Sequence, residues 1–205
     1  MATYETEEQQ MEAIRTWWRH NGKSLIAGLV VGLAISLGWQ GWQHYRNNLG
    51  VTASGAYQSF VASERGTDAF TIQGQHIIEA YADLPYAALA ALLLAADASE
   101  RSDLDTTERH LRWVIDHADT ASLVRLAELR LAEVSIVTGK PDRALELLGD
   151  VAPEGFEALH AELRGDALAQ QGDRQGAVQA YDQALARAQA GDRQWLQLKR
   201  DDLGV

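Results

Sequence analysis

The stretches LAEVSIVTGKPDRALELL (131–148) and RGDALAQQGDRQGAVQAY (164–181) carry small residues in the same order. The aligned pairs, each 33 residues apart, are Ala132 with Gly165, Gly139 with Gly172, Ala144 with Ala177, and Leu148 with Tyr181. A period of this length is typical of stacked helix pairs. A small residue lets two helices cross closely, and a glycine makes the turn between them. The repeat therefore predicts an all-α array of helical hairpins.

The order of small, glycine, small, aromatic and small residues resembles the tetratricopeptide repeat. The copy that matches it best consists of Gly165, Gly172, Ala177, Tyr181 and Ala184. An earlier, less regular copy is predicted from about Ala88 to Ala121, with Ser102 at its turn. A further helix pair is predicted over 45–64 and 70–83. The stretch with Trp195, Leu196, Leu198 and Leu203 suits the terminal cap that such arrays need. Pro85, Pro141 and Pro153 each predict a helix start.

A long uncharged stretch, SLIAGLVVGLAISLGWQGWQHY (24–45), lies near the N-terminus. A helix over 24–42 would rise about 28 Å, close to the roughly 30 Å of a bilayer's hydrocarbon core. The rings that would form interfacial belts are Trp17 and Trp18 before this stretch, and Trp39, Trp42 and Tyr45 at its far end. The sequence therefore predicts one N-terminal transmembrane helix. The alternatives are a cleaved signal peptide, which the preceding acids and the bulky aromatic residues disfavour, and a core helix, which seldom lacks charge on every face.

Basic residues set the predicted orientation. Arg15, Arg19 and Lys23 precede the span, whereas only Arg46 follows within twenty residues. We expect residues 1–23 in the cytoplasm, 24–42 in the bacterial inner membrane, and 43–205 in the periplasm as one domain.

Small residues repeat every four positions within the span, at Gly28, Gly32 and Ser36, and form a ridge that another membrane helix could contact.

The composition excludes several classes of function. The 205 residues carry a net charge of −11, which disfavours nucleic acid, and the absence of cysteine excludes disulfides and thiolate chemistry. The six histidines are scattered, and no HExxH, GxSxG, phosphate-binding or dinucleotide-binding motif occurs. We therefore expect neither an enzyme nor a bound cofactor or metal.

Tetratricopeptide-like arrays commonly bind peptides in a groove lined by their first helices. The corresponding positions here are Leu126, Leu129, Glu133, Ile136 and Val137, followed by Leu159, Glu162 and Asp166. This set predicts an apolar groove with an acidic rim, which suits a partner with apolar anchors and some positive charge. The alternative is that the leucines belong to the core between helices.

Three further motifs carry a resemblance that covers essentially the whole chain. They are YETEEQ (4–9) with the following Glu12, Arg15, Trp17-Trp18 and Asn21-Gly22-Lys23, then ELRGDALAQQGD (162–173), and LQLKRDDL (196–203). With the predicted anchor and repeats, they resemble the YfgM-type ancillary subunits of the bacterial Sec translocon.

This resemblance implies a non-enzymatic partner of the SecYEG channel and of a PpiD-type membrane-anchored chaperone, embedded in the lipid bilayer. The implied role is transfer of newly translocated client chains to periplasmic chaperones. The alternative role is that of a regulatory adaptor whose residues 1–23 restrain an envelope-stress response regulator. Catalytic residues are not implied.

Overall fold

The computed structural model describes the backbone of residues 3–204 and most of their side chains; the side chains of 3–10, 13, 25, 45 and 47 lie outside the description. The YETEEQ motif and the predicted belt residue Tyr45 therefore fall on side chains that are not described. All regular structure between 3 and 204 is helical, as the repeat predicts. The chain divides into two compact units, Met1–Thr52 and Ala53–Val205.

The first unit consists of most of helix α1, which runs from Thr3 to Ala62. Within the described residues, no single helix has both the length and the apolar character of a membrane span. The segments Ile14–Ser24 and Ile26–Ala62, which meet at a bend of 40°, could form one together by length and composition. The predicted span over 24–42 begins at this bend and stays a prediction.

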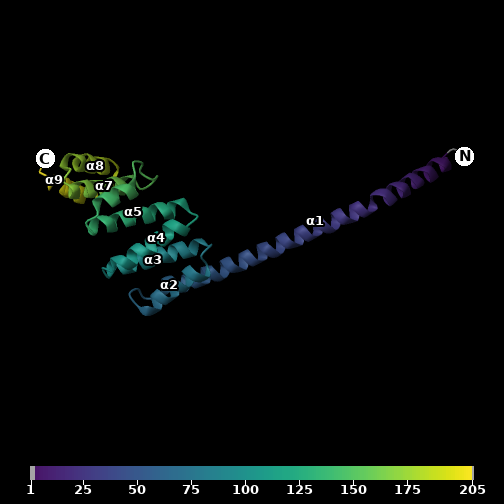
Figure 1. The fold of residues 1–205 in the computed structure, drawn as a ribbon, viewed down its shortest axis with the longest axis horizontal. Helices are drawn as coiled ribbons and strands as arrows, with labels where there is room; N and C mark the ends of the chain where they lie inside the picture. Colours follow the sequence, from purple (N-terminus) through teal and green to yellow (C-terminus); the bar gives the residue numbers. More distant parts are fainter. Residues whose placement is uncertain (1–2, 205) are drawn as a thin grey trace. The chain divides into compact units, whose positions relative to one another are not determined.

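The second unit is a succession of helices in which each one from α2 to α9 packs against the next (Figure 1). The bounds are α2 Asp68–Ala80, α3 Pro85–Glu100, α4 Leu104–His117, α5 Ala121–Val137, α6 Pro141–Leu148, α7 Glu157–Gln171, α8 Arg174–Arg187 and α9 Arg193–Asp201. This arrangement agrees with the predicted hairpin array.

Local sequence signals explain where most of these helices begin. Side-chain oxygens of Thr67, Asp103 and Asp173 accept backbone N–H groups at the starts of α2, α4 and α8. Pro85 and Pro141 open α3 and α6, as predicted.

The prediction for Pro153 is wrong. This residue lies in the turn before α7, where its carbonyl accepts a hydrogen bond from the Phe156 N–H at 3.0 Å. Helix α7 begins only at Glu157, because the chain first completes this turn.

The predicted turn positions are confirmed by their backbone angles. Gly139 and Gly172 have φ values of 73° and 86° in the turns that follow α5 and α7. Ser102, predicted at the turn of the less regular copy, has a φ of 60° and is the single non-glycine residue with positive φ among those described. The turn of the less regular copy therefore has the same left-handed backbone conformation, although a serine occupies the position of the glycine.

Small residues allow the helices to cross closely. Ala132, Ala144 and Ala177 are completely buried. A Cβ atom added to Gly165 of α7 would lie 2.6 Å from the Tyr181 ring of α8, closer than real Cβ contacts. The repeat signature therefore marks the contacts between helices.

The terminal helix α9 covers the end of the array, and Leu196 is its buried residue. Leu196 is buried among Tyr181, Ala184 and Ala188. Trp195 and Leu198, also predicted for the cap, remain exposed. The helix predicted as a cap is therefore present, and Leu196 with the partly buried Leu203 supplies its apolar contacts to the array.

We expect Gly165→Ala to destabilise the array. The added methyl group would gain about 1 kcal/mol of helix propensity, but overpacking against Tyr181 would cost about 1–3 kcal/mol. Thermal unfolding of the full chain in mild detergent, followed by circular dichroism, measures the difference. Gly55→Ala is the matched control, because this helical glycine has nothing near a new Cβ and should gain stability. Equal stabilisation of both variants would contradict the close-crossing interpretation.

Candidate functional site

The main candidate site is an apolar cleft of about 560 Å³ between helices α3, α4 and α5. Its lining consists of Leu92, Ala95, Ala96 and Ser99 from α3, Ser102 from the turn, Leu104, Thr107 and Leu111 from α4, and Leu126, Arg130, Glu133, Val134 and Val137 from α5. Protein and small-molecule ligands commonly bind in apolar hollows that carry a few polar groups. We refer to this set of residues as the α3–α5 cleft.

One face of α5 supplies a wall of the cleft. Leu126, Arg130, Glu133 and Val137 follow one another at steps of four, three and four residues, which places them on one side of the helix. Val137 is 68% exposed, so its side chain is available to a partner. Arg130 Nη1 lies 2.9 Å from Glu133 Oε2. The two charges on this wall therefore compensate one another.

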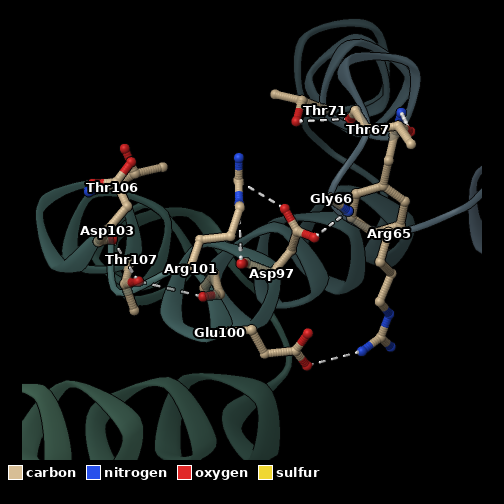
Figure 2. A network of polar contacts seen from close by, with 12 residues as sticks. Arg65, Gly66, Thr67, Thr71, Asp97, Glu100, Arg101, Asp103, Thr106 and Thr107 are labelled. Carbon is tan, nitrogen blue, oxygen red and sulfur yellow. Dashed lines mark hydrogen bonds and ion pairs between the residues drawn. The ribbon is translucent and has the colours of Figure 1, made fainter.

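A buried carboxylate fixes the end of α3 (Figure 2). Asp97 is only 1% exposed, and its Oδ1 accepts a hydrogen bond of 2.6 Å from the Gly66 N–H. Arg101 Nη2 lies 2.7 Å from Asp97 Oδ2, a distance at which the charges attract, although no hydrogen bond reaches this oxygen. These contacts join the loop between α1 and α2 to the α3 wall of the cleft.

The turn between α3 and α4 is fixed by a second set of hydrogen bonds (Figure 2). The Thr107 hydroxyl donates to the Asp103 carbonyl at 2.9 Å and lies 3.4 Å from the Ala95 carbonyl. The Thr106 N–H donates to Asp103 Oδ1 at 3.1 Å. Hydrogen bonding to Thr106 holds the pKa of Asp103 below its usual value. The cleft thus has a rigid end beside Ser102.

The structure separates the predicted groove residues into two sets. Leu126, Glu133 and Val137 line the α3–α5 cleft. Leu129 is 2% exposed and belongs to the core shared by α5, α6 and α7, against which Ile136 and Leu159 also pack. Leu129 therefore occupies the core position of the alternative, whereas Leu159 and Ile136 are partly buried at the edge of this core. Sequence reasoning did not find the residues of α3 and α4, since it aligned only the better-matched repeats.

Glu162 and Asp166, predicted for the acidic rim, are paired with side chains of the last two helices. Lys199 of α9 places its Nζ 2.8 Å from Glu162 Oε1 and 2.7 Å from Asp166 Oδ2. The Tyr181 hydroxyl donates to Asp166 Oδ1 at 2.7 Å. The two carboxylates therefore join α7 to α8 and α9, and they do not line the α3–α5 cleft.

The pKa values of this cluster follow from its burial and charges. Burial alone would lower the pKa of Lys199, but hydrogen bonds to Asp166 and Glu162 outweigh it and raise the pKa above its usual value. Burial, followed by the hydrogen bond to Asp166, raises the pKa of the Tyr181 hydroxyl. Lys199 is thus charged and Tyr181 neutral at physiological pH, which is the arrangement that these contacts require.

The ridge predicted within the membrane segment is open in the first unit. An added Cβ at Gly28 or Gly32 would have no neighbouring atom within 4 Å. The Ser36 hydroxyl lies 3.5 Å from the Gln40 amide on the same helix. Contact with another membrane helix stays a prediction for these three residues. Within the described residues, no group of three or more histidine, aspartate or glutamate side chains lies close enough together to hold a metal ion.

Comparison with known proteins identifies the family to which this chain belongs. Residues 15–205 match the family model described as "Tetratricopeptide repeat-like domain". A curated protein of Escherichia coli named "Ancillary SecYEG translocon subunit" is 32% identical over 182 residues, which cover 89% of this chain and 88% of the relative. The chain belongs to the family of ancillary SecYEG translocon subunits. Relatives of this family with the same name occur in Haemophilus influenzae, 28% identical over 96% of this chain and 97% of the relative, and in Neisseria gonorrhoeae, 27% identical over 99% and 100%.

No solved structure matches the chain detectably. For a member of the ancillary translocon subunit family, the repeat-like domain and the relatives' names together point to protein interaction without catalysis.

We expect Lys199→Met to destabilise the full chain by about 1–3 kcal/mol, because Glu162 and Asp166 would be left largely buried without their shared cation. Chemical unfolding in mild detergent measures this difference. The matched control is Arg174→Met, which removes an exposed cation at the start of α8 and should change stability by less than about 0.5 kcal/mol. Similar effects of the two substitutions would show that the cluster contributes nothing specific.

Proposed function

We propose that this chain is a membrane-anchored ancillary subunit of the SecYEG translocon and acts by binding proteins. The observation that carries the proposal is the near full-length similarity, at 27–32% identity, to four curated proteins with that name. The tetratricopeptide-like array supports a binding role, because such arrays present extended surfaces to partners.

The exposed apolar residues of α1 support residues 24–42 as the anchor. Leu29 and Ile35 are 73% and 68% exposed, and Leu33 and Leu37 are also exposed. A stretch that is apolar on every face is stable only when lipid or protein covers it. In the proposed topology, residues 1–23 lie in the cytoplasm and the array lies in the periplasm, with the anchor in the inner membrane.

The α3–α5 cleft supports a role in handling client chains. Its apolar wall and compensated charges suit an apolar segment of a newly translocated chain, which is unfolded and exposes such segments. In the proposed role, the array passes these chains to a PpiD-type chaperone. The ridge at Gly28, Gly32 and Ser36 would contact a membrane helix of the channel or of this chaperone.

We expect topology and association to be measurable in the natural chain, because it contains no cysteine. A membrane-impermeant maleimide should label an Ala190→Cys variant in intact spheroplasts, and a Glu12→Cys variant only after lysis; both positions are exposed. The same variants should co-purify with SecYEG after mild detergent extraction. Labelling of Glu12→Cys before lysis would refute the orientation, and loss of SecYEG from the wild-type preparation would refute the association.

We expect Val137→Glu to weaken client capture without unfolding the array, because Val137 is exposed at the cleft. A photo-crosslinker at Leu126 should capture translocating chains in the wild-type background, and Val137→Glu should lower the yield at least about threefold, since one charge in an apolar site costs more than 1 kcal/mol. The matched control is Ile72→Glu on α2, which is equally exposed and lies outside the cleft. An equal loss in both variants, or no crosslinks at Leu126, would refute a client site in the cleft.

A further inference from the structure

We propose that residues 11–23 of α1 form a surface helix that lies on the anionic cytoplasmic leaflet, with Met11, Ile14 and Trp18 inserted among the lipid chains. This inference rests on the proposed anchor at 24–42 and adds a second, in-plane contact with the membrane. It assigns a partner, the lipid surface, to the exposed side chains of Met11 and Ile14, which neither the span nor the array uses, and places them beside the predicted belt residue Trp18.

The apolar side chains of this segment lie on one face. Met11, Ile14 and Trp18 are separated by three and four residues, so they follow one side of the helix, and Trp17 borders it. All four are more than half exposed. A folded chain rarely leaves such a run of large apolar side chains without a partner.

The charged side chains lie on the opposite face. Glu12, Arg19 and Lys23 are separated by seven and four residues, which places them about 100° or more around the helix from Trp18. Arg15 lies between the two faces. The described segment 11–23 contains one acid and three bases, Arg15, Arg19 and Lys23. A positive surface helix with apolar and aromatic residues on its other face fits an anionic leaflet.

The bend in α1 makes this orientation accessible. The segment Ile14–Ser24 departs by 40° from the direction of Ile26–Ala62. Together with a typical span tilt of about 20°, this bend would bring the segment to within roughly 30° of the membrane plane. A straight helix along the span would instead carry Met11 and Ile14 away from the lipid.

Apolar surface continues across the bend. A shallow hollow of about 650 Å³ is lined by Trp17 and Trp18 before the bend and by Ile26 and Leu29 after it. The Trp18 ring lies over Gly22, where an added Cβ would be 3.3 Å from Trp18 Cε2. We call the face formed by Met11, Ile14 and Trp18 the apolar stripe. The stripe and the span present one connected apolar surface, so lipid that covers the span would also reach the stripe.

Depth measurements in vesicles test the inference on the full chain. Single cysteines at Met11, Ile14 and Trp18 and at Glu12, Arg19 and Lys23 would carry an environment-sensitive fluorophore, in vesicles of phosphatidylcholine and phosphatidylglycerol that contain nitroxide-labelled lipid. Leu33→Cys in the span serves as the reference for the anchor. We expect quenching at least about twofold stronger at the first three positions than at the second three, in step with the helical period.

The outcomes separate the two proposals. Quenching at Leu33→Cys with uniformly weak quenching from 11 to 23 would overturn the surface helix and leave the anchor intact. This is also the result expected if the stripe binds a protein, which these vesicles lack. Absence of quenching at Leu33→Cys would overturn the anchor and, with it, the surface helix.

A substitution pair controls for loss of folding. On the Met11→Cys background, Trp18→Glu should reduce quenching about twofold or more, because it places a charge in the inserted face. His20→Glu adds the same charge at an exposed position away from the stripe and should reduce quenching much less. Equal reductions would overturn the assignment of this face to lipid.

Discussion

The close approach of neighbouring helices is the constraint on which the array depends. Tyr181 of α8 packs where Gly165 of α7 has no side chain, and alanines fill the corresponding crossings elsewhere. Dispersion contacts require such distances, because even a small gap loses much of their attraction. Helices held this closely leave little freedom in how successive hairpins stack, so the fold follows from where the small residues occur.

Charged side chains add further links between helices. Lys199 joins α9 to α7, and Arg143 of α6 lies 2.9 Å from Glu108 of α4. The hydrogen bond from Arg143 holds the pKa of Glu108 below its usual value. Asp97 likewise joins α3 to the loop between α1 and α2, because it accepts a hydrogen bond from the Gly66 N–H. The α3–α5 cleft lies where Asp97 and the α3–α4 turn add to the packing of α3 against α2 and α4.

The sequence predicts the features that depend on local order. Helical period, turn positions and uncharged length are properties of neighbouring residues, which is why Ser102 could be placed at a turn without a glycine. Features that depend on distant pairing were missed: Glu162 and Asp166 meet a lysine more than thirty residues away, and Leu129 is covered by α6 and α7. Pro153 shows the same limit, since a turn and a helix start share their sequence signals. The bend in α1 could not be predicted either, because no proline lies near it in the sequence.

The pairing of Arg130 with Glu133 also determines how the cleft responds to its surroundings. Because these two charges lie on one helix and compensate each other, the cleft wall attracts neither sign of partner at long range. Ionic strength should therefore have little influence on what the cleft holds. Temperature should have a larger influence on binding in the cleft, since the stabilisation gained by burying apolar surface weakens on cooling. In the proposed client-binding role, such a site would distinguish unfolded from folded chains by their exposed apolar surface, whatever the charge of the client.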